Sequence, residues 1–88
     1  MKNIRGTVVK SLAGHDRGKW FVIISCDDHF AFIADGKSRT INNPKRKNHI
    51  HLAQTKTVLS DSEMNSDESI RGFLKRYDSK PSEGVVNV

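Results

Sequence analysis

The sequence has one cysteine among its 88 residues, which excludes an internal disulfide. Cys26 ends an apolar stretch, and this predicts a small buried side chain at that position. Long hydrophobic runs are also missing, because the longest, at residues 20–24, is far too short to cross a bilayer. No charged-then-apolar leader opens the chain. We therefore expect a reduced, cytoplasmic protein without a membrane partner.

A convincing catalytic constellation is also lacking. Asp27 and Asp28 are adjacent, so they point to opposite sides of a strand or hold a turn. Cys26 and His29 have no third group in a fixed relation to them, and an apolar strand offers no activation of the thiol. These residues favour a turn, and we expect the protein not to be an enzyme.

Metal-ligand spacing is equally sparse. His49 and His51 lie two residues apart, so on an extended strand they could share a metal with His15, His29 or Cys26. Neither a Cys-x-x-Cys pair nor a His-x-x-x-His helix accompanies them. Histidines beside a basic segment more often contact phosphate or face water. We expect neither a metal nor another cofactor.

Positive charge is concentrated in the first part of the chain. The net charge is +5, but residues 1–56 carry eleven Lys and Arg against four Asp, whereas residues 57–88 carry four against six acidic residues. A basic domain favours a polyanionic partner, although surface cations can also simply solvate a small domain. The length suffices for one small domain without a large catalytic cleft.

Short apolar runs predict a mainly β domain. Five antiparallel strands are expected at residues 5–12, 19–25, 30–34, 39–41 and 49–53. Asp35-Gly36 is a strong hairpin signal. The hinge at residues 13–18 holds Gly14 and Gly18, which can take positive φ, and Asp16, which can close an Asx turn. Such strands suggest a small barrel or sandwich.

The last third of the chain predicts a linker, a helix and a tail. Residues 57–66 are polar and suit a linker, and residues 79–88 suit a flexible tail. At residues 67–78 we expect a short amphipathic helix, because Ile70, Phe73, Leu74 and Tyr77 fall on one face. Gly72 weakens it by roughly 1 kcal/mol relative to alanine. The apolar face should pack on the barrel, with docking to a partner protein as the alternative.

The first hairpin resembles the KOW motif. Gly6 precedes the valines of the first strand, the loop at residues 14–19 follows, and an aliphatic strand closes the pattern at residues 21–24. Residues 35–39 and 43–47 extend the resemblance to small bacterial KOW-domain RNA-binding proteins, which are similar to a group of archaeal and eukaryotic large-subunit ribosomal proteins.

This resemblance covers residues 4–54 and implies an SH3-like barrel at residues 1–56. It also implies an RNA-binding protein of the ribosome or of translation, with ribosomal RNA as the partner. KOW domains occur in transcription elongation factors too, where they can bind polymerase or other proteins. A protein-interaction module of the transcription or translation machinery is therefore the alternative function.

The predicted RNA-binding surface consists of loop cations, whose phosphate contacts would make affinity depend strongly on salt. Its densest part is a basic loop at residues 45–47, after Pro44. Trp20 and Phe30 are candidates for base stacking, although a core role for Trp20 is equally open. The predicted contacts are the side chains of His15, Arg17, Lys19, Trp20, Lys37, Arg39, Lys45, Arg46 and Lys47, and the backbone of Gly14 and Gly18.

Overall fold

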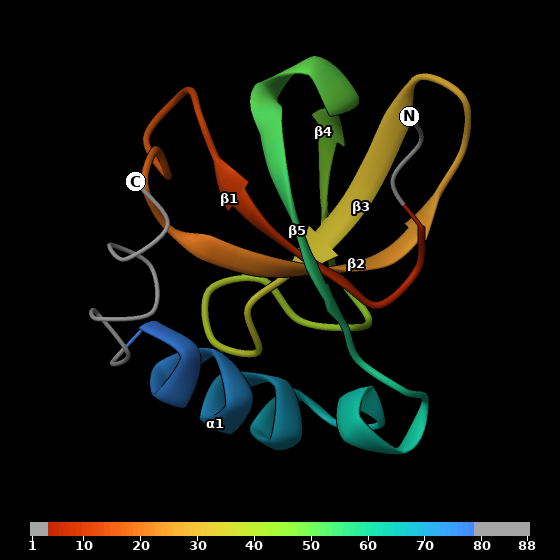
Figure 1. The fold of residues 1–88 in the computed structure, drawn as a ribbon, viewed down its shortest axis with the longest axis vertical. Helices are drawn as coiled ribbons and strands as arrows, with labels where there is room; N and C mark the ends of the chain where they lie inside the picture. Colours follow the sequence, from red (N-terminus) through yellow and green to blue (C-terminus); the bar gives the residue numbers. More distant parts are fainter. Residues whose placement is uncertain (1–3, 79–88) are drawn as a thin grey trace.

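A five-stranded antiparallel sheet forms most of the protein, and one helix packs against it (Figure 1). The computed structural model describes residues 4–78. Its elements are β1 (Thr7–Ser11), β2 (Trp20–Cys26), β3 (Phe30–Ala34), β4 (Lys45–Asn48), β5 (Leu52–Val58) and α1 (Asp67–Asp78), with short 3-10 turns at η1 (His49–His51) and η2 (Ser62–Met64). The strand order is β4-β3-β2-β1-β5. The mainly β prediction is confirmed, and the topology is consistent with an SH3-like barrel.

The β1–β2 hairpin has the predicted strand–loop–strand form. Val8 pairs with Val22, and Lys10 pairs with Trp20. Gly14 and Gly18 have φ values of 83° and 85°, in the left-handed region that favours glycine. At the neck of the loop the Ser11 amide donates to the Lys19 carbonyl oxygen at 3.0 Å. The two glycines therefore allow the chain to reverse at this end of the hairpin.

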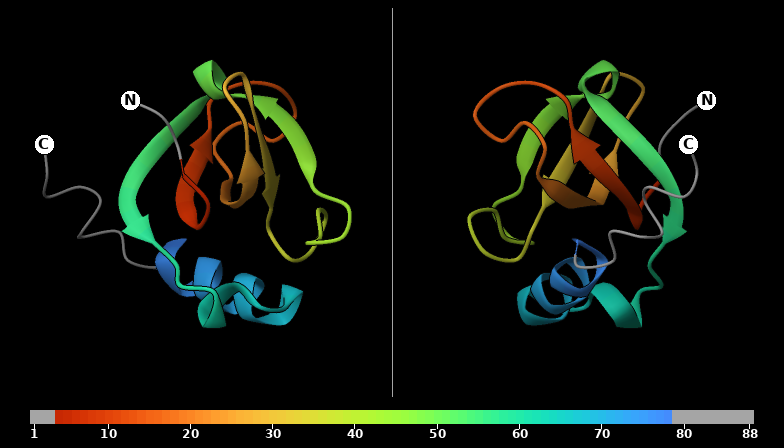
Figure 2. Two further views of the ribbon diagram at one scale, coloured as in Figure 1. Left: turned by 90° about the vertical axis from the view of Figure 1, so that its right-hand side faces the viewer. Right: turned by 60° about the vertical axis from the view of Figure 1, so that its left-hand side comes forward.

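The sheet is apolar on both faces because both faces are covered. Val8 and Val22 belong to a core cluster that includes residues of α1, whereas Val9, Phe21 and Ile23 form a second cluster inside the curled sheet. All five side chains are at most 2% exposed. Figure 2 shows α1 lying along one side of the curled sheet. This arrangement explains why β2 is almost continuously apolar rather than alternating.

Helix α1 packs on the barrel through its predicted apolar face. Ile70 and Leu74 are 0% and 6% exposed and contact the cluster around Val8 and Val22. Phe73 and Tyr77 are half-buried against the same cluster. The helix is short, so this burial supplies stability that an isolated helix of its length lacks.

The fourth and fifth strands differ from the prediction. Residues 39–41 contain only an isolated bridge from Thr40 to Asn43, because the Asp35 carboxylate accepts from the Lys37 and Arg39 amides and holds the segment as a turn. The predicted basic loop is instead strand β4, so the loop prediction was wrong. Residues 49–51 form η1, since the Asn48 side chain accepts from the Ile50 amide, and β5 follows them.

The segment predicted as a polar linker is partly structured. Residues 57 and 58 complete β5, and Leu59 and Met64 are 4% and 3% exposed in the core. Leu59 is fixed because its amide donates to the Gly6 carbonyl oxygen at 2.9 Å. The predicted tail at residues 79–88 lies outside the described residues. In the described part of the chain, no helix is long and apolar enough to cross a membrane.

Candidate nucleic-acid interface

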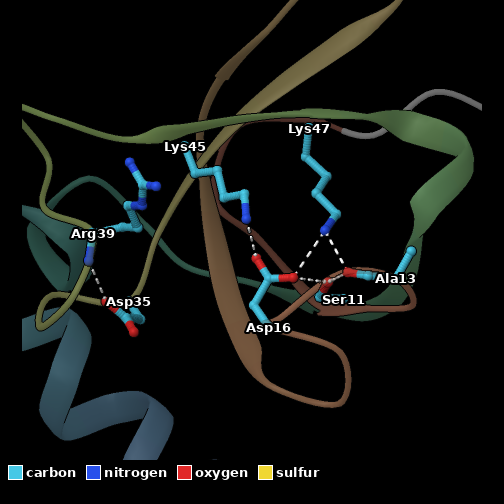
Figure 3. Close-up of polar contacts among 7 residues, drawn as sticks. All are labelled: Ser11, Ala13, Asp16, Asp35, Arg39, Lys45 and Lys47. Atoms are coloured by element: carbon cyan, nitrogen blue, oxygen red, sulfur yellow. Dashed lines mark hydrogen bonds and ion pairs between the residues drawn. The ribbon is translucent and has the colours of Figure 1, made fainter.

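Two of the three cations in β4 point toward the β1–β2 loop (Figure 3). Because side chains alternate along a strand, Lys45 and Lys47 share one face and Arg46 takes the other. Lys47 is 8% exposed, and its Nζ atom donates to Asp16 Oδ1 at 2.8 Å and to the Ala13 carbonyl oxygen at 2.7 Å. Lys45 Nζ forms an ion pair with Asp16 Oδ2 at 2.9 Å.

Asp16 is the centre of this cluster. Its Oδ1 atom also accepts from the Ser11 hydroxyl at 2.7 Å, and the residue is 8% exposed. Burial raises the pKa of Asp16, but hydrogen bonds from Lys47 and Ser11, together with Lys45, outweigh burial and hold the pKa well below its usual range. Asp16 does not close an Asx turn with Gly18, because the Gly18 amide donates to the Ser11 carbonyl oxygen and both carboxylate oxygens face the β4 lysines.

We call Ser11, Asp16, Lys45 and Lys47 the β4 latch. In the sheet order β4 stands at one edge, next to β3. The latch connects that edge to the loop after β1, so side chains join two segments far apart in the sequence. Lys47 can contact a phosphate only if it breaks its ion pair with the buried Asp16 carboxylate. Residues 45–47 therefore do not form an exposed loop: they lie in β4, Lys47 is buried against Asp16, and the Lys45 side chain is 30% exposed and pairs with the same carboxylate. Their contact with RNA stays a prediction.

Arg46 is the exposed cation of β4. Its guanidinium carbon lies 4.6 Å from the centre of the Phe30 ring, a cation–π distance. This contact occupies one face of a ring that the sequence offered for base stacking. Arg46 can still contact a phosphate, but it does so from the face of β4 opposite the latch.

A groove lies where two loops meet α1. It is open, has a volume of about 760 Å³, and combines the end of the β1–β2 loop, the β3–β4 loop and one side of the helix. The residues that line it are Gly18, Lys19, Trp20, Asp35, Lys37, Ser38, Glu68, Arg71, Gly72, Leu74 and Lys75. In Figure 1 the β3–β4 loop, in yellow-green, runs between the sheet and the helix.

Close packing fixes the β3–β4 loop against α1. The Arg71 guanidinium donates to the Gly36 carbonyl oxygen at 2.8 Å, and the Ile41 amide donates to the Asp67 carboxylate at 2.8 Å. Gly36 has a φ of 78°, and a Cβ atom there would overlap the Asp67 carbonyl oxygen. Glycine is therefore required at this position, and the groove wall that contains Lys37 is held in place.

The groove is net positive. Lys19, Lys37, Arg71 and Lys75 bring four cations, whereas Asp35 and Glu68 bring two carboxylates. One oxygen of Asp35 already accepts two backbone amides. An anion of phosphate size can thus approach several cations at once, and this is the chemistry that the groove offers.

Trp20 both packs and lines the groove. Its ring contacts Tyr77 edge-to-face, with the centroids 5.0 Å apart, and it packs against the core cluster under α1. Lys10 Nζ lies 5.3 Å from the Trp20 ring centre. Trp20 is half-buried and is one of the residues that line the groove.

The structure gathers only some of the predicted contacts in one place. Lys19, Trp20, Lys37 and the Gly18 backbone line the groove, whereas Lys45 and Lys47 belong to the β4 latch. His15 and Arg17 are exposed on the same loop as Gly14, and Arg39 is half-buried in the β3–β4 loop. The Gly18 amide, expected to face phosphate, donates to the Ser11 carbonyl oxygen at 2.8 Å.

Sequence reasoning missed the contribution of α1 to this groove. Glu68, Arg71, Gly72 and Lys75 follow the spacing i, i+3, i+4 and i+7, which puts them along one side of a helix. The acidic charge of the C-terminal part obscured this pattern. Helical spacing predicts this face of α1 as it predicts the apolar face.

The histidines do not assemble into a metal site. His49 Nε2 lies 2.7 Å from the Asp27 carbonyl oxygen, at the β2–β3 turn. Within residues 4–78, no group of three His, Cys, Asp or Glu side chains is arranged to hold a metal ion.

Comparison with known proteins adds no family assignment. No protein-family model and no curated protein matches this chain. The likeness to KOW proteins therefore rests on the residues of the hairpin and its two following segments.

Proposed function

We propose that the protein binds structured RNA through phosphate contacts from its basic loops. The observation that supports this most is the convergence of Lys19 and Lys37, which are distant in sequence, on one net-positive groove. Arg17 is exposed on the same loop, two residues before Lys19. The likeness to KOW proteins supports a cytoplasmic, cofactor-free role at the ribosome or in translation.

The alternative, a protein-interaction module, loses one candidate contact surface. That surface was the apolar face of α1, but Ile70 and Leu74 are buried against the sheet. Co-purification separates the two functions, because a nuclease-sensitive association with ribosomes supports RNA. A nuclease-resistant association with one protein supports the alternative.

The direct test is binding of a labelled RNA hairpin across a range of salt concentrations. If three to five cations contact phosphate, the log of the affinity falls against log salt with a slope of roughly −2 to −4.5. Replacing both groove-wall lysines, Lys19→Gln with Lys37→Gln, should weaken binding and reduce the slope by about 1.4 to 1.8.

The matched control removes the same charge elsewhere. Arg5 precedes β1 and Lys56 lies on β5; both residues are exposed, and neither lines the groove. Arg5→Gln with Lys56→Gln should therefore change the affinity much less. Equal losses from the two double variants would mean diffuse attraction rather than a localised site, and no binding by the wild type would refute RNA binding altogether.

A further inference from the structure

Gly72 occupies a position where packing does not require glycine. It lies in the middle of α1, where glycine is unfavourable relative to alanine. A Cβ atom at Gly72 would approach only the Arg76 guanidinium, at 4.0 Å. Gly36 is different, because a Cβ atom there would also come within 2.9 Å of the Arg71 amide nitrogen. Contacts within the protein thus explain Gly36 but not Gly72.

The surroundings of Gly72 point to a ligand. Gly72 lines the groove, and glycine is the residue that lets a ligand come close to a backbone. Trp20 and Leu74 give the groove apolar lining beside Gly72, and cationic side chains surround it. An aromatic ring next to several cations is the combination that holds the base and the phosphate of single-stranded nucleic acid.

The size of the groove decides which part of an RNA fits. Its volume of about 760 Å³ is in the range of small-molecule sites. A duplex is too wide to enter, whereas unpaired loops and bulges present single bases that can be turned outward. The occupant that matches the space and the charge is therefore one nucleotide.

We propose that the groove receives one unpaired nucleotide of the bound RNA, with its base against Gly72 and Trp20 and its phosphate beside Lys19, Lys37 and Lys75. This proposal rests on the proposed function and adds the kind of RNA that the site selects. A structured RNA with an unpaired nucleotide binds better than a blunt duplex, because only the former fills the groove.

The test enlarges the side chain at position 72 without altering charge. Gly72→Ala should raise the melting temperature by a few degrees, because alanine is the better helix former and the Cβ has room. Gly72→Leu should fill the groove and weaken binding of a labelled RNA hairpin by roughly tenfold, the size of one lost base–aromatic contact. Binding of a blunt RNA duplex should change little in either variant.

Ser69→Leu is the matched control. Ser69 is exposed on α1 and does not line the groove, so the variant adds similar bulk to the same helix outside the site. Its affinity for the hairpin should equal that of the wild type. Trp20 is the only tryptophan, so quenching of its fluorescence by the hairpin reports groove occupancy directly.

The possible outcomes distinguish the groove proposal from the proposed RNA-binding function on which it rests. If the wild type binds the hairpin and Gly72→Leu binds it equally well, the groove proposal is overturned while RNA binding stands. Equal losses for hairpin and duplex also overturn it, because they show that an unpaired nucleotide is not selected. If the wild type binds neither RNA, the proposed function itself fails. Weaker binding by the more stable Gly72→Ala would support the groove without any ambiguity from folding.

Discussion

Lys47 of β4 and Lys37 of the β3–β4 loop have the same side chain in opposite surroundings. Lys47 is 8% exposed and is held by Asp16 and the Ala13 carbonyl oxygen. Lys37 is exposed at the wall of the groove. The densest run of positive charge, at residues 45–47, is thus partly buried. The cations of the β1–β2 loop, the β3–β4 loop and α1 are farther apart in sequence, yet they line one groove. Burial against a carboxylate, more than local charge density, separates the two groups.

The two groups of cations should also differ in what they contribute to stability. A buried ion pair is costly to break, because removing one partner leaves a charge without compensation. Exposed cations contribute little to stability, since water and salt screen them. Variants of the β4 latch should therefore lower stability, and variants of the groove should lower affinity.

The largest effect is expected from Asp16→Asn. The variant leaves Lys47, which is 8% exposed, without its charged partner, so the free energy of unfolding should fall by about 3 kcal/mol. Urea denaturation measures this change. Glu68→Gln, which removes an exposed carboxylate from the groove, should shift it by under about 0.5 kcal/mol. Similar values for the two variants would contradict the structural role of the latch.

The pH dependence of the unfolding free energy should show the titration of Asp16. The pKa of Asp16 lies below its unfolded-state value of 3.8, so its contribution to stability is present above that value and is lost as the pH falls through the folded-state pKa. Unfolding measured from about pH 7 to pH 3 should therefore show a loss of stability that Asp16→Asn lacks.

Other carboxylates with a lowered pKa do not affect the difference between the stability curves of the wild type and Asp16→Asn. Backbone amides of Phe30 and His29 lower the pKa of Asp27, and the backbone amide of Ser60 lowers the pKa of Glu63. Both groups titrate equally in the wild type and in Asp16→Asn. Parallel stability curves for the two proteins would mean that Asp16 does not titrate with folding.

Substitution of Lys47 should lower the unfolding free energy more than substitution of Lys45. Lys47→Met removes a charge-assisted hydrogen bond from a buried site and should cost about 2 kcal/mol of unfolding free energy. Lys45→Met should cost under about 1 kcal/mol, because the Lys45 side chain is 30% exposed and its ion pair is partly screened. Denaturation of the two single variants measures the difference. The reverse order would show that the latch is assigned to the wrong lysine.

The smallest effect on stability is expected at the groove. Lys19→Gln with Lys37→Gln should leave the unfolding free energy within about 0.5 kcal/mol of the wild type, because both side chains are exposed. The same double variant should bind RNA hairpin more weakly. A large loss of stability would place these lysines in the same class as Lys47.

Local pattern predicted most of the fold. The first three strands and α1 lie where apolar runs and helical spacing place them, since each has a strong periodic or apolar signal. β4 was missed because its residues, Lys45 to Asn48, carry no apolar signal at all. Its strand form depends on pairing with β3 and on Asp16, which is 31 residues from Lys47. No local sequence pattern predicts the contact between Asp16 and Lys47.

The candidate site was only half predictable for the same reason. Lys19 and Lys37 lie in loops with clear glycine and aspartate signals, and loops are usually exposed. The role of Lys47 depended on a distant carboxylate, and the role of Arg71 depended on which side of α1 meets the β3–β4 loop. Tertiary structure decides whether a lysine or arginine side chain is buried and which group it contacts. Composition alone therefore overestimated the exposure of the β4 lysines and did not indicate the α1 cations that line the groove.

Lysine labelling read by mass spectrometry tests the central distinction in one experiment on the wild-type protein. In the protein alone, Lys47 should react slowest, and Lys19, Lys37, Lys56 and Lys75 should react fast because they are exposed. Adding RNA hairpin should slow labelling of Lys19, Lys37 and Lys75 several-fold and leave Lys47 and Lys56 unchanged. If Lys47 instead reacts as fast as Lys56 in the protein alone, Lys47 is not held in a buried ion pair; if RNA protects Lys45 and Lys47 but not the groove lysines, the groove is not the RNA-binding surface.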